Sequence, residues 1–315
     1  MSGGAMFDVL TRSRGVVVGY DGSGPAEHAV DWAAAEAAHR GVPLTVASAL
    51  DVTGLVAGAD TAPLSGDVGQ LSAIARQGSA RARRAAPGLD VREVARPDGA
   101  AGMLVELSRW SELVVVGKRG HGEVAGALLG SVAFAVTAHA QCPVAVVQGA
   151  SHVRPGPGRP VLTGVDGSAE SLLALEYAAE LAARAGAALT VATAWRCTTT
   201  NTWAGAHAAG VDVAAETRAR AREVAAAAVE AARARHPGLV VGAEVLIGLP
   251  GPVLADLAAE HALLVVGSRG RGGFTGLLLG SVSHAVIHRS PCPVVVVRPA
   301  GERVPVPDAA RATTA

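Results

Sequence analysis

Short apolar runs alternate along the chain with longer segments in which apolar residues recur every three or four positions. The first run, Gly15–Tyr20, is uncharged and bounded by turn residues, as expected of a strand buried on both faces. Gly24 and Pro25 then begin a segment with helical spacing, which ends at Gly41. A proline suits the first helical turn because its missing N–H would have no partner there. The pattern therefore predicts a buried strand followed by a helix.

The same alternation continues along the chain and predicts further strands joined by helices. In the first half the predicted strands are Gly15–Tyr20, Leu44–Leu50, Val91–Ala95, Leu113–Val116 and Val144–Val147. In the second half they are Pro160–Val165, Ala188–Ala194, Val240–Leu246, Leu263–Val266 and Val294–Val297. Helices are expected between them, for example at Glu216–Arg235 and Pro252–His261. Alternating strands and helices are typical of an α/β fold with doubly wound parallel sheets.

The second half of the chain repeats the first. The segment Val16–Ser23 recurs as Val161–Ser168, 145 residues later, and Leu113–Gly117 recurs as Leu263–Gly267, 150 residues later. Leu-Leu-Gly-Ser-Val and Cys-Pro-Val also occur in both halves, again 150 residues apart. Several matches in one order indicate a tandem duplication. We therefore predict two domains of five parallel strands each, at residues 14–148 and 160–298.

The remaining segments are short and differ in composition from the two repeats. Residues 149–159 hold prolines and glycines and are predicted to be a linker. Residues 1–13 and 299–315 are predicted to be a flexible N-terminus and a flexible tail.

Charge and cysteine content limit the function classes. Acidic and basic residues balance at 27 each, which argues against a nucleic-acid surface. The three cysteines show no CxxC spacing, and we assign no metal cluster to the ten histidines. No signal peptide is apparent, and the uncharged stretch Val124–Val153 is too interrupted by glycine, proline and polar residues to favour a membrane span. We expect a cytoplasmic protein.

A glycine-rich loop follows the fourth predicted strand of each repeat. It has the pattern Gly-two residues-Gly-nine residues-Gly-Ser in both copies, from Gly117 to Ser131 and from Gly267 to Ser281. Glycine lets backbone N–H groups approach phosphate oxygens and tolerates positive φ. The final Gly-Ser begins the last helix, whose N-terminal N–H groups favour an anion. The loop therefore predicts a phosphate site at the carboxyl ends of the strands.

This loop, followed by Cys-Pro-Val and a last strand, resembles the universal stress protein family in its ATP-binding form. The resemblance covers roughly residues 14–148 and 160–298. It implies two Rossmann-like domains of the adenine nucleotide alpha hydrolase-like type, and ATP as ligand, with Mg²⁺ as a possible counter-ion to the phosphates. The site residues that it implies are Asp21, Ala49, Gly117, Gly120, Gly130, Ser131 and Val132 in the first repeat, and Asp166, Ala194, Gly267, Gly270, Gly280, Ser281 and Val282 in the second.

Within this set, Asp21 and Asp166 would face the adenosine end, Ala49 and Ala194 the adenine, and Gly117 and Gly267 the ribose. The other residues would bind the phosphates. Basic loop residues are further phosphate candidates, although solvated loop charges are the commoner outcome: Arg119, His121, Arg269 and Arg271.

Several residues have a simpler interpretation beside the functional one. Asp21 suits either a ligand contact or a cap for the following helix. Ser131 and Ser281 suit helix caps, phosphate contacts or both. Cys142 and Cys292 lie in apolar surroundings and are predicted to be core residues rather than nucleophiles.

The resemblance implies a regulator of stress response or dormancy that acts through nucleotide occupancy and a protein partner. The alternative is a slow ATPase or a phosphoryl- or nucleotidyl-transferase, although no Walker A sequence and no catalytic triad can be located. A nucleotide-free scaffold is the third hypothesis. The last strands of the two repeats are expected to pair within the chain or in a homodimer, because an apolar sheet edge left open favours aggregation.

Overall fold

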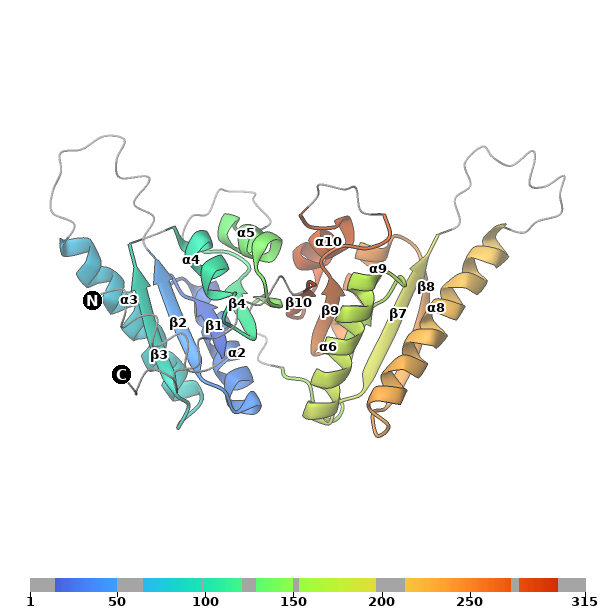
Figure 1. Ribbon diagram of the computed structural model, residues 1–315, viewed down its shortest axis with the longest axis horizontal. Helices are drawn as coiled ribbons and strands as arrows, with labels where there is room; N and C mark the ends of the chain where they lie inside the picture. The colour runs from blue at the N-terminus through green and yellow to red at the C-terminus, as the bar shows by residue number, and fades with distance from the viewer. Residues whose placement is uncertain are drawn as a thin grey trace, which may run out of the picture. The chain divides into compact units, whose positions relative to one another are not determined.

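The computed structural model describes residues 15–49, 65–97, 99–120, 129–149, 153–196, 213–272 and 278–299. The chain forms two compact units, with the boundary between them near the middle of the sequence (Figure 1). We call the first repeat lobe 1 and the second repeat lobe 2, and describe each by itself.

Lobe 1 alternates strands and helices, as the sequence predicts. Its elements are β1 (Val16–Gly19), α2 (Gly24–Arg40), β2 (Leu44–Ala49), α3 (Ser65–Ala85), β3 (Val91–Arg96), α4 (Ala100–Leu107), β4 (Leu113–Gly117), α5 (Ser131–His139) and β5 (Val144–Val147). The strand order is β3-β2-β1-β4-β5, and β1 pairs in parallel with both β2 and β4. The order therefore reverses direction between β1 and β4.

Lobe 2 repeats this arrangement. Its elements are β6 (Val161–Gly164), α6 (Ala169–Ala185), β7 (Leu189–Trp195), α8 (Val213–Arg235), β8 (Val241–Ile247), α9 (Pro250–Leu257), the 3₁₀ turn η2 (Ala258–Glu260), β9 (Leu263–Gly267), α10 (Ser281–Arg289) and β10 (Val294–Val297). The order β8-β7-β6-β9-β10 reverses between β6 and β9. The ten strand assignments made from the sequence are confirmed, each end to within one residue.

Two helix pairs cover each sheet. In lobe 1, α2 packs against α3, and α4 packs against α5. Crossover connections between parallel strands are right-handed. The sheet grows from β1 toward β3 on one side and toward β5 on the other, so the helices that connect the two sets of strands lie on opposite faces of the sheet. Both faces of the central strands are therefore buried, and Val16, Val18 and Val115 are fully inaccessible to solvent. The predicted α/β class is confirmed.

The first helix of each lobe has a defined start and end. Ser23 is the N-cap of α2 and accepts a hydrogen bond from the backbone N–H of Ala26 at 3.3 Å, and Ser168 does the same for Ser171 at 3.2 Å. Gly41 ends α2 at φ 67°, a left-handed conformation that glycine adopts without steric cost. The two N-caps fix where the chain passes from β1 into α2 and from β6 into α6.

The described part of the linker contains a tight turn. Gly156 and Arg159 exchange two backbone hydrogen bonds, of 3.1 and 2.9 Å, across Gly158 at φ 75°. No helix among the described residues is long and apolar enough to cross a membrane.

Candidate functional site

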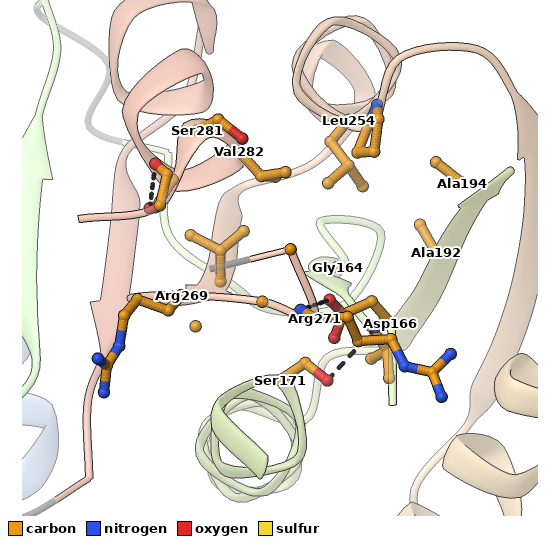
Figure 2. A pocket seen from close by; sticks show the side chains of 18 of the residues that line it. Gly164, Asp166, Ser171, Ala192, Ala194, Leu254, Arg269, Arg271, Ser281 and Val282 are labelled. Atoms are coloured by element: carbon orange, nitrogen blue, oxygen red, sulfur yellow. Dashed lines mark hydrogen bonds between the residues drawn. The ribbon is translucent and has the colours of Figure 1, made fainter. Parts of the chain in front are cut away.

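Each lobe has a cavity at the carboxyl ends of its central strands. The cavity of lobe 1 has a volume of about 280 Å³ and lies between the ends of β1, β2 and β4 and the start of α5. The corresponding cavity of lobe 2 has a volume of about 570 Å³ (Figure 2). Both lie where the strand order reverses, which is where open α/β sheets bind ligands.

An aspartate at the end of the first strand organises the turn into the first helix. Asp21 Oδ1 accepts the backbone N–H of Ser23 at 2.9 Å. Asp166 Oδ1 accepts both the N–H and the hydroxyl of Ser168, at 2.9 and 2.6 Å. The N-caps are the serines, so the interpretation of Asp21 as the helix cap is wrong. The aspartates instead hold the turn that precedes the cap, and each lines its cavity.

The second glycine of each loop lies directly against this aspartate. A Cβ atom on Gly270 would lie 2.5 Å from Asp166 Oδ2, and one on Gly120 would collide with Asp21 Oδ2. In lobe 2 the same carboxylate oxygen accepts the backbone N–H of Arg271 at 2.8 Å (Figure 2). Close approach therefore explains these glycines, because no side chain fits between the loop and the carboxylate.

The first glycine of each loop faces the start of the first helix. A Cβ on Gly117 would lie 2.9 Å from the carbonyl of Pro25, and one on Gly267 would lie 2.8 Å from the carbonyl of Glu170. None of the six motif glycines has positive φ. The expectation of positive φ is therefore wrong for these glycines, which instead allow close contact with a carboxylate at Gly120 and Gly270 and with backbone at the other four positions.

The third glycine closes the loop onto the last helix. The N–H of Gly130 donates to the carbonyl of Lys118 at 2.9 Å, and that of Gly280 to the carbonyl of Ser268 at 2.8 Å. These glycines are the N-caps of α5 and α10, which places Ser131 and Ser281 at the first helical position. The interpretation of the two serines as caps is therefore wrong.

The N-cap residues of α5 and α10 are glycines and so supply no side-chain cap. The first turn of an α-helix has backbone N–H groups without intrahelical partners and carries a partial positive charge. In both lobes this turn lines the cavity, through Ser131 and Val132 in one and Ser281 and Val282 in the other. The arrangement suits an anion.

The opposite wall of each cavity is apolar. In lobe 2 Ala192, Ala194 and Leu254 face the cavity across from Ser281 and Val282 (Figure 2). Lobe 1 has Ala47, Ala49 and Leu104 at the matching places. The two leucines, on α4 and α9, were missed from the sequence, and the apolar spacing of those helices was the available signal. Such a wall suits a flat, weakly polar group.

Among the described residues, basic side chains line the two cavities in unequal number. Arg119 lines the cavity of lobe 1, whereas Arg196, Arg269 and Arg271 line that of lobe 2. Arg196 was not predicted. Arg269 also forms an ion pair of 3.3 Å with Glu170. His121 lies outside the described residues.

The aspartate of lobe 2, Asp166, has a shifted pKa. Burial raises the pKa of Asp166, but hydrogen bonds from Ser168, the N–H of Arg271 and Ser171 outweigh it and leave the pKa below its ordinary value. A carboxylate held ionised in this way is a poor general base at neutral pH. In lobe 1, burial lowers the pKa of Lys118, with Arg119 adding to the shift.

The predicted site residues therefore come together. All fourteen that the resemblance implies line the two cavities, as do Arg119, Arg269 and Arg271. Their contacts with a ligand stay predictions. Cys142 and Cys292 are buried away from the cavities, which confirms them as core residues, and burial raises the pKa of Cys142 to about 12. The described residues contain no group of three or more His, Cys, Asp or Glu that could hold a metal ion.

Comparison with known proteins identifies the family. The model of the universal stress protein family matches residues 13–148 and 158–298. Two universal stress proteins of Mycobacterium tuberculosis are each 36% identical to this chain over 91% of its length, and over 98% and 97% of their own. The crystal structure of a universal stress protein from Archaeoglobus fulgidus covers 90% of this chain and 98% of its own, with a TM-score of 0.65 and 21% identity.

Smaller family members match one half of the chain. Universal stress proteins solved in complexes with cAMP and with dAMP each cover 44% of it, at TM-scores of 0.34. The family model spans both repeats, and the relatives align along nearly the full chain. This chain belongs to the universal stress protein family.

Proposed function

We propose that each lobe binds one molecule of ATP and that the protein acts as a stress-response or dormancy regulator through the occupancy of the two sites. The observation that carries the proposal is the juxtaposition, in both lobes, of an apolar wall and a helix N-terminus with glycine as its N-cap across one cavity. The apolar wall suits the adenine, and the helix N-terminus suits the phosphates.

The ribose would lie between these two ends, near Asp166 in lobe 2 and Asp21 in lobe 1. Asp166 Oδ2 already accepts the N–H of Arg271, so a ribose hydroxyl would share an ionised acceptor. The arginines near the phosphate end add positive charge, and Mg²⁺ would act as a further counter-ion to the phosphates.

The same arrangement favours binding over turnover. Fast phosphoryl transfer needs a group that orients the attacking oxygen and charge stabilisation at the γ-phosphate. Asp166 is engaged by Ser168 and Arg271. We therefore propose at most slow hydrolysis, with a slow ATPase or a transferase as the second candidate. A protein partner, pairing of the two lobes through their last strands and a cytoplasmic location stay predictions from the sequence.

Calorimetric titration of nucleotide-free protein with ATP tests the proposal. The wild type should bind two equivalents, and Gly130→Glu and Gly280→Glu should each bind one, because the new carboxylate would repel phosphate at the helix N-terminus. Gly130→Ala is the matched control, since its Cβ would lie 3.4 Å from the nearest atoms and fits with little adjustment.

Two outcomes would contradict the proposal. Absence of ATP binding to the wild type would remove nucleotide occupancy as the function. Two equivalents with unchanged affinity in both glutamate variants would show that ATP binds elsewhere. Steady-state phosphate release with Mg²⁺ separates a binding protein from an enzyme, because about one turnover per second is the lower end of ordinary enzyme rates.

A further inference from the structure

Two histidines on α10 lie side by side in lobe 2. His284 and His288 are four residues apart, so their side chains project from the same face of the helix. Their ring centroids are 4.3 Å apart, and the rings are tilted by 58°. The two Nε2 atoms approach each other to 3.1 Å. At this distance one ring can donate an N–H to the other, so both Nε2 atoms lie close together on the same side of the helix. The spacing of a histidine, three residues and a histidine was missed from the sequence.

This separation matches that of two imidazoles on one metal ion. Zinc–nitrogen bonds of about 2.0–2.1 Å place two ligand nitrogens roughly 2.9 Å apart at a 90° angle and roughly 3.3 Å apart at the tetrahedral angle. The observed 3.1 Å lies between these values. A cation could therefore bridge the two Nε2 atoms with little movement of either ring.

The pair is accessible and separate from the nucleotide cavity. His284 is exposed and His288 is half-buried. Neither histidine lines the cavity of lobe 2, although Ser281 and Val282 in the first turn of the same helix do. Water can therefore complete the coordination shell without displacing any residue assigned to ATP.

Lobe 1 does not provide the same pair. The residues at the matching positions of α5 are Phe134 and Ala138, which offer no ligand atoms. The difference predicts one such metal site per chain, in lobe 2.

We propose that His284 and His288 form a binding site for one divalent transition-metal ion of the kind that imidazole favours, Zn²⁺, Ni²⁺ or Cu²⁺. The ion links successive turns of α10 and so stabilises that helix, whose first turn borders the cavity. Two protein ligands with water give weaker binding than the four-ligand shell of a structural zinc site.

The test is a titration of the full chain, prepared without a histidine tag, with Zn²⁺ and separately with Ni²⁺. We expect one equivalent to bind, and His284→Ala and His288→Ala each to weaken binding by roughly tenfold or more, at least as much as loss of an outer-shell partner does. His139→Ala, at the exposed end of α5, is the control and should bind metal like the wild type.

A second measurement covers the possibility that a variant misfolds. His284→Gln and His288→Gln keep a polar side chain on the helix, and their circular dichroism and ATP binding should match the wild type while metal binding is lost. Absence of metal binding to the wild type would overturn the proposal. So would binding that the four histidine substitutions leave unchanged.

Discussion

The two lobes share a backbone arrangement but differ in the charges around it. In both, the second glycine of the loop lies against the aspartate that follows the first strand. The third glycine donates a hydrogen bond back to the loop and is the N-cap of the last helix. Among the residues that the structure describes, Arg119 lines the cavity of lobe 1, whereas Arg196, Arg269 and Arg271 line that of lobe 2.

The comparison shows that steric contacts require the glycines of the loop but do not require the arginines around it. A side chain at Gly120 or Gly270 would collide with a carboxylate, so the fold of the loop excludes it. Arg119, Arg269 and Arg271 are exposed and have no such steric constraint. We infer that both lobes retain the backbone geometry of the site and differ in how strongly they attract phosphate.

The largest expected effect concerns these arginines. With only lobe 2 competent, in the Gly130→Glu background, replacing Arg196, Arg269 and Arg271 by alanine should weaken ATP binding by about 100-fold or more, because one hydrogen bond to a charged group contributes about 1.5–3 kcal/mol. Arg119→Ala, in the Gly280→Glu background, should cost about tenfold.

Calorimetry with ATP and with adenosine distinguishes charge from structure. Adenosine carries no phosphate, so its affinity should hardly change in either set of variants. Equal losses for ATP and adenosine would mean that the arginines support the fold and not the phosphates.

A smaller effect, on the stability of lobe 2, is expected from replacing Asp166. Asp166→Asn should destabilise lobe 2 by about 1–2 kcal/mol at neutral pH, because it weakens the bonds from Ser168 and Arg271. The folded pKa of Asp166 is lowered, so its contribution is complete above the unfolded pKa near 3.8 and is lost as the pH falls through the folded value. The stability difference between wild type and variant should therefore shrink below that pH.

Peptide-resolved hydrogen exchange measures the loss of stability in each lobe separately. Protection should fall in β6 and α6 and remain unchanged in β1 and α2. A difference that stays constant down to strongly acidic pH would show that the carboxylate charge is not the cause.

The smallest effect concerns Ser283, which has Ala133 as its counterpart in lobe 1. Its buried hydroxyl lies 3.0 Å from the carbonyl of Ser268 and 2.9 Å from that of Gly280. Ser283→Ala should lower the stability of lobe 2 by about 1 kcal/mol, the usual net contribution of one hydrogen bond. Urea unfolding of the nucleotide-free protein measures it, with the exposed Ser281→Ala as a control that leaves stability unchanged.

The sequence predicted the elements and the positions of the site better than the reasons for them. Apolar runs located the ten strands because both faces of a parallel sheet are buried. The repeated glycine pattern located the loops. The role of Gly120 could not be derived, because its constraint is Asp21, which is distant in the chain and meets it only after folding. Arg196 was missed because it follows β7 outside any motif.

The serines show the same limit in local structure. The sequence places Ser131 beside Gly130 at a helix start, but either residue could be the N-cap. Gly130 is the N-cap because its backbone is extended and its carbonyl accepts the N–H of Phe134. The bond from Gly130 N–H to the carbonyl of Lys118 joins residues that are far apart in the sequence and holds Gly130 at this place. Boundaries that tertiary contacts set are the least predictable part of a helix.

The buried thiols have a consequence for the reaction of the protein with oxidants. Peroxides react with the thiolate, and a pKa of about 12 leaves roughly one Cys142 side chain in 10⁵ deprotonated at pH 7. Burial likewise raises the pKa of Cys292. Both sulfurs are also shielded by the sheet and its helices from reagents in solution. These two positions should therefore resist sulfenylation while the fold is intact.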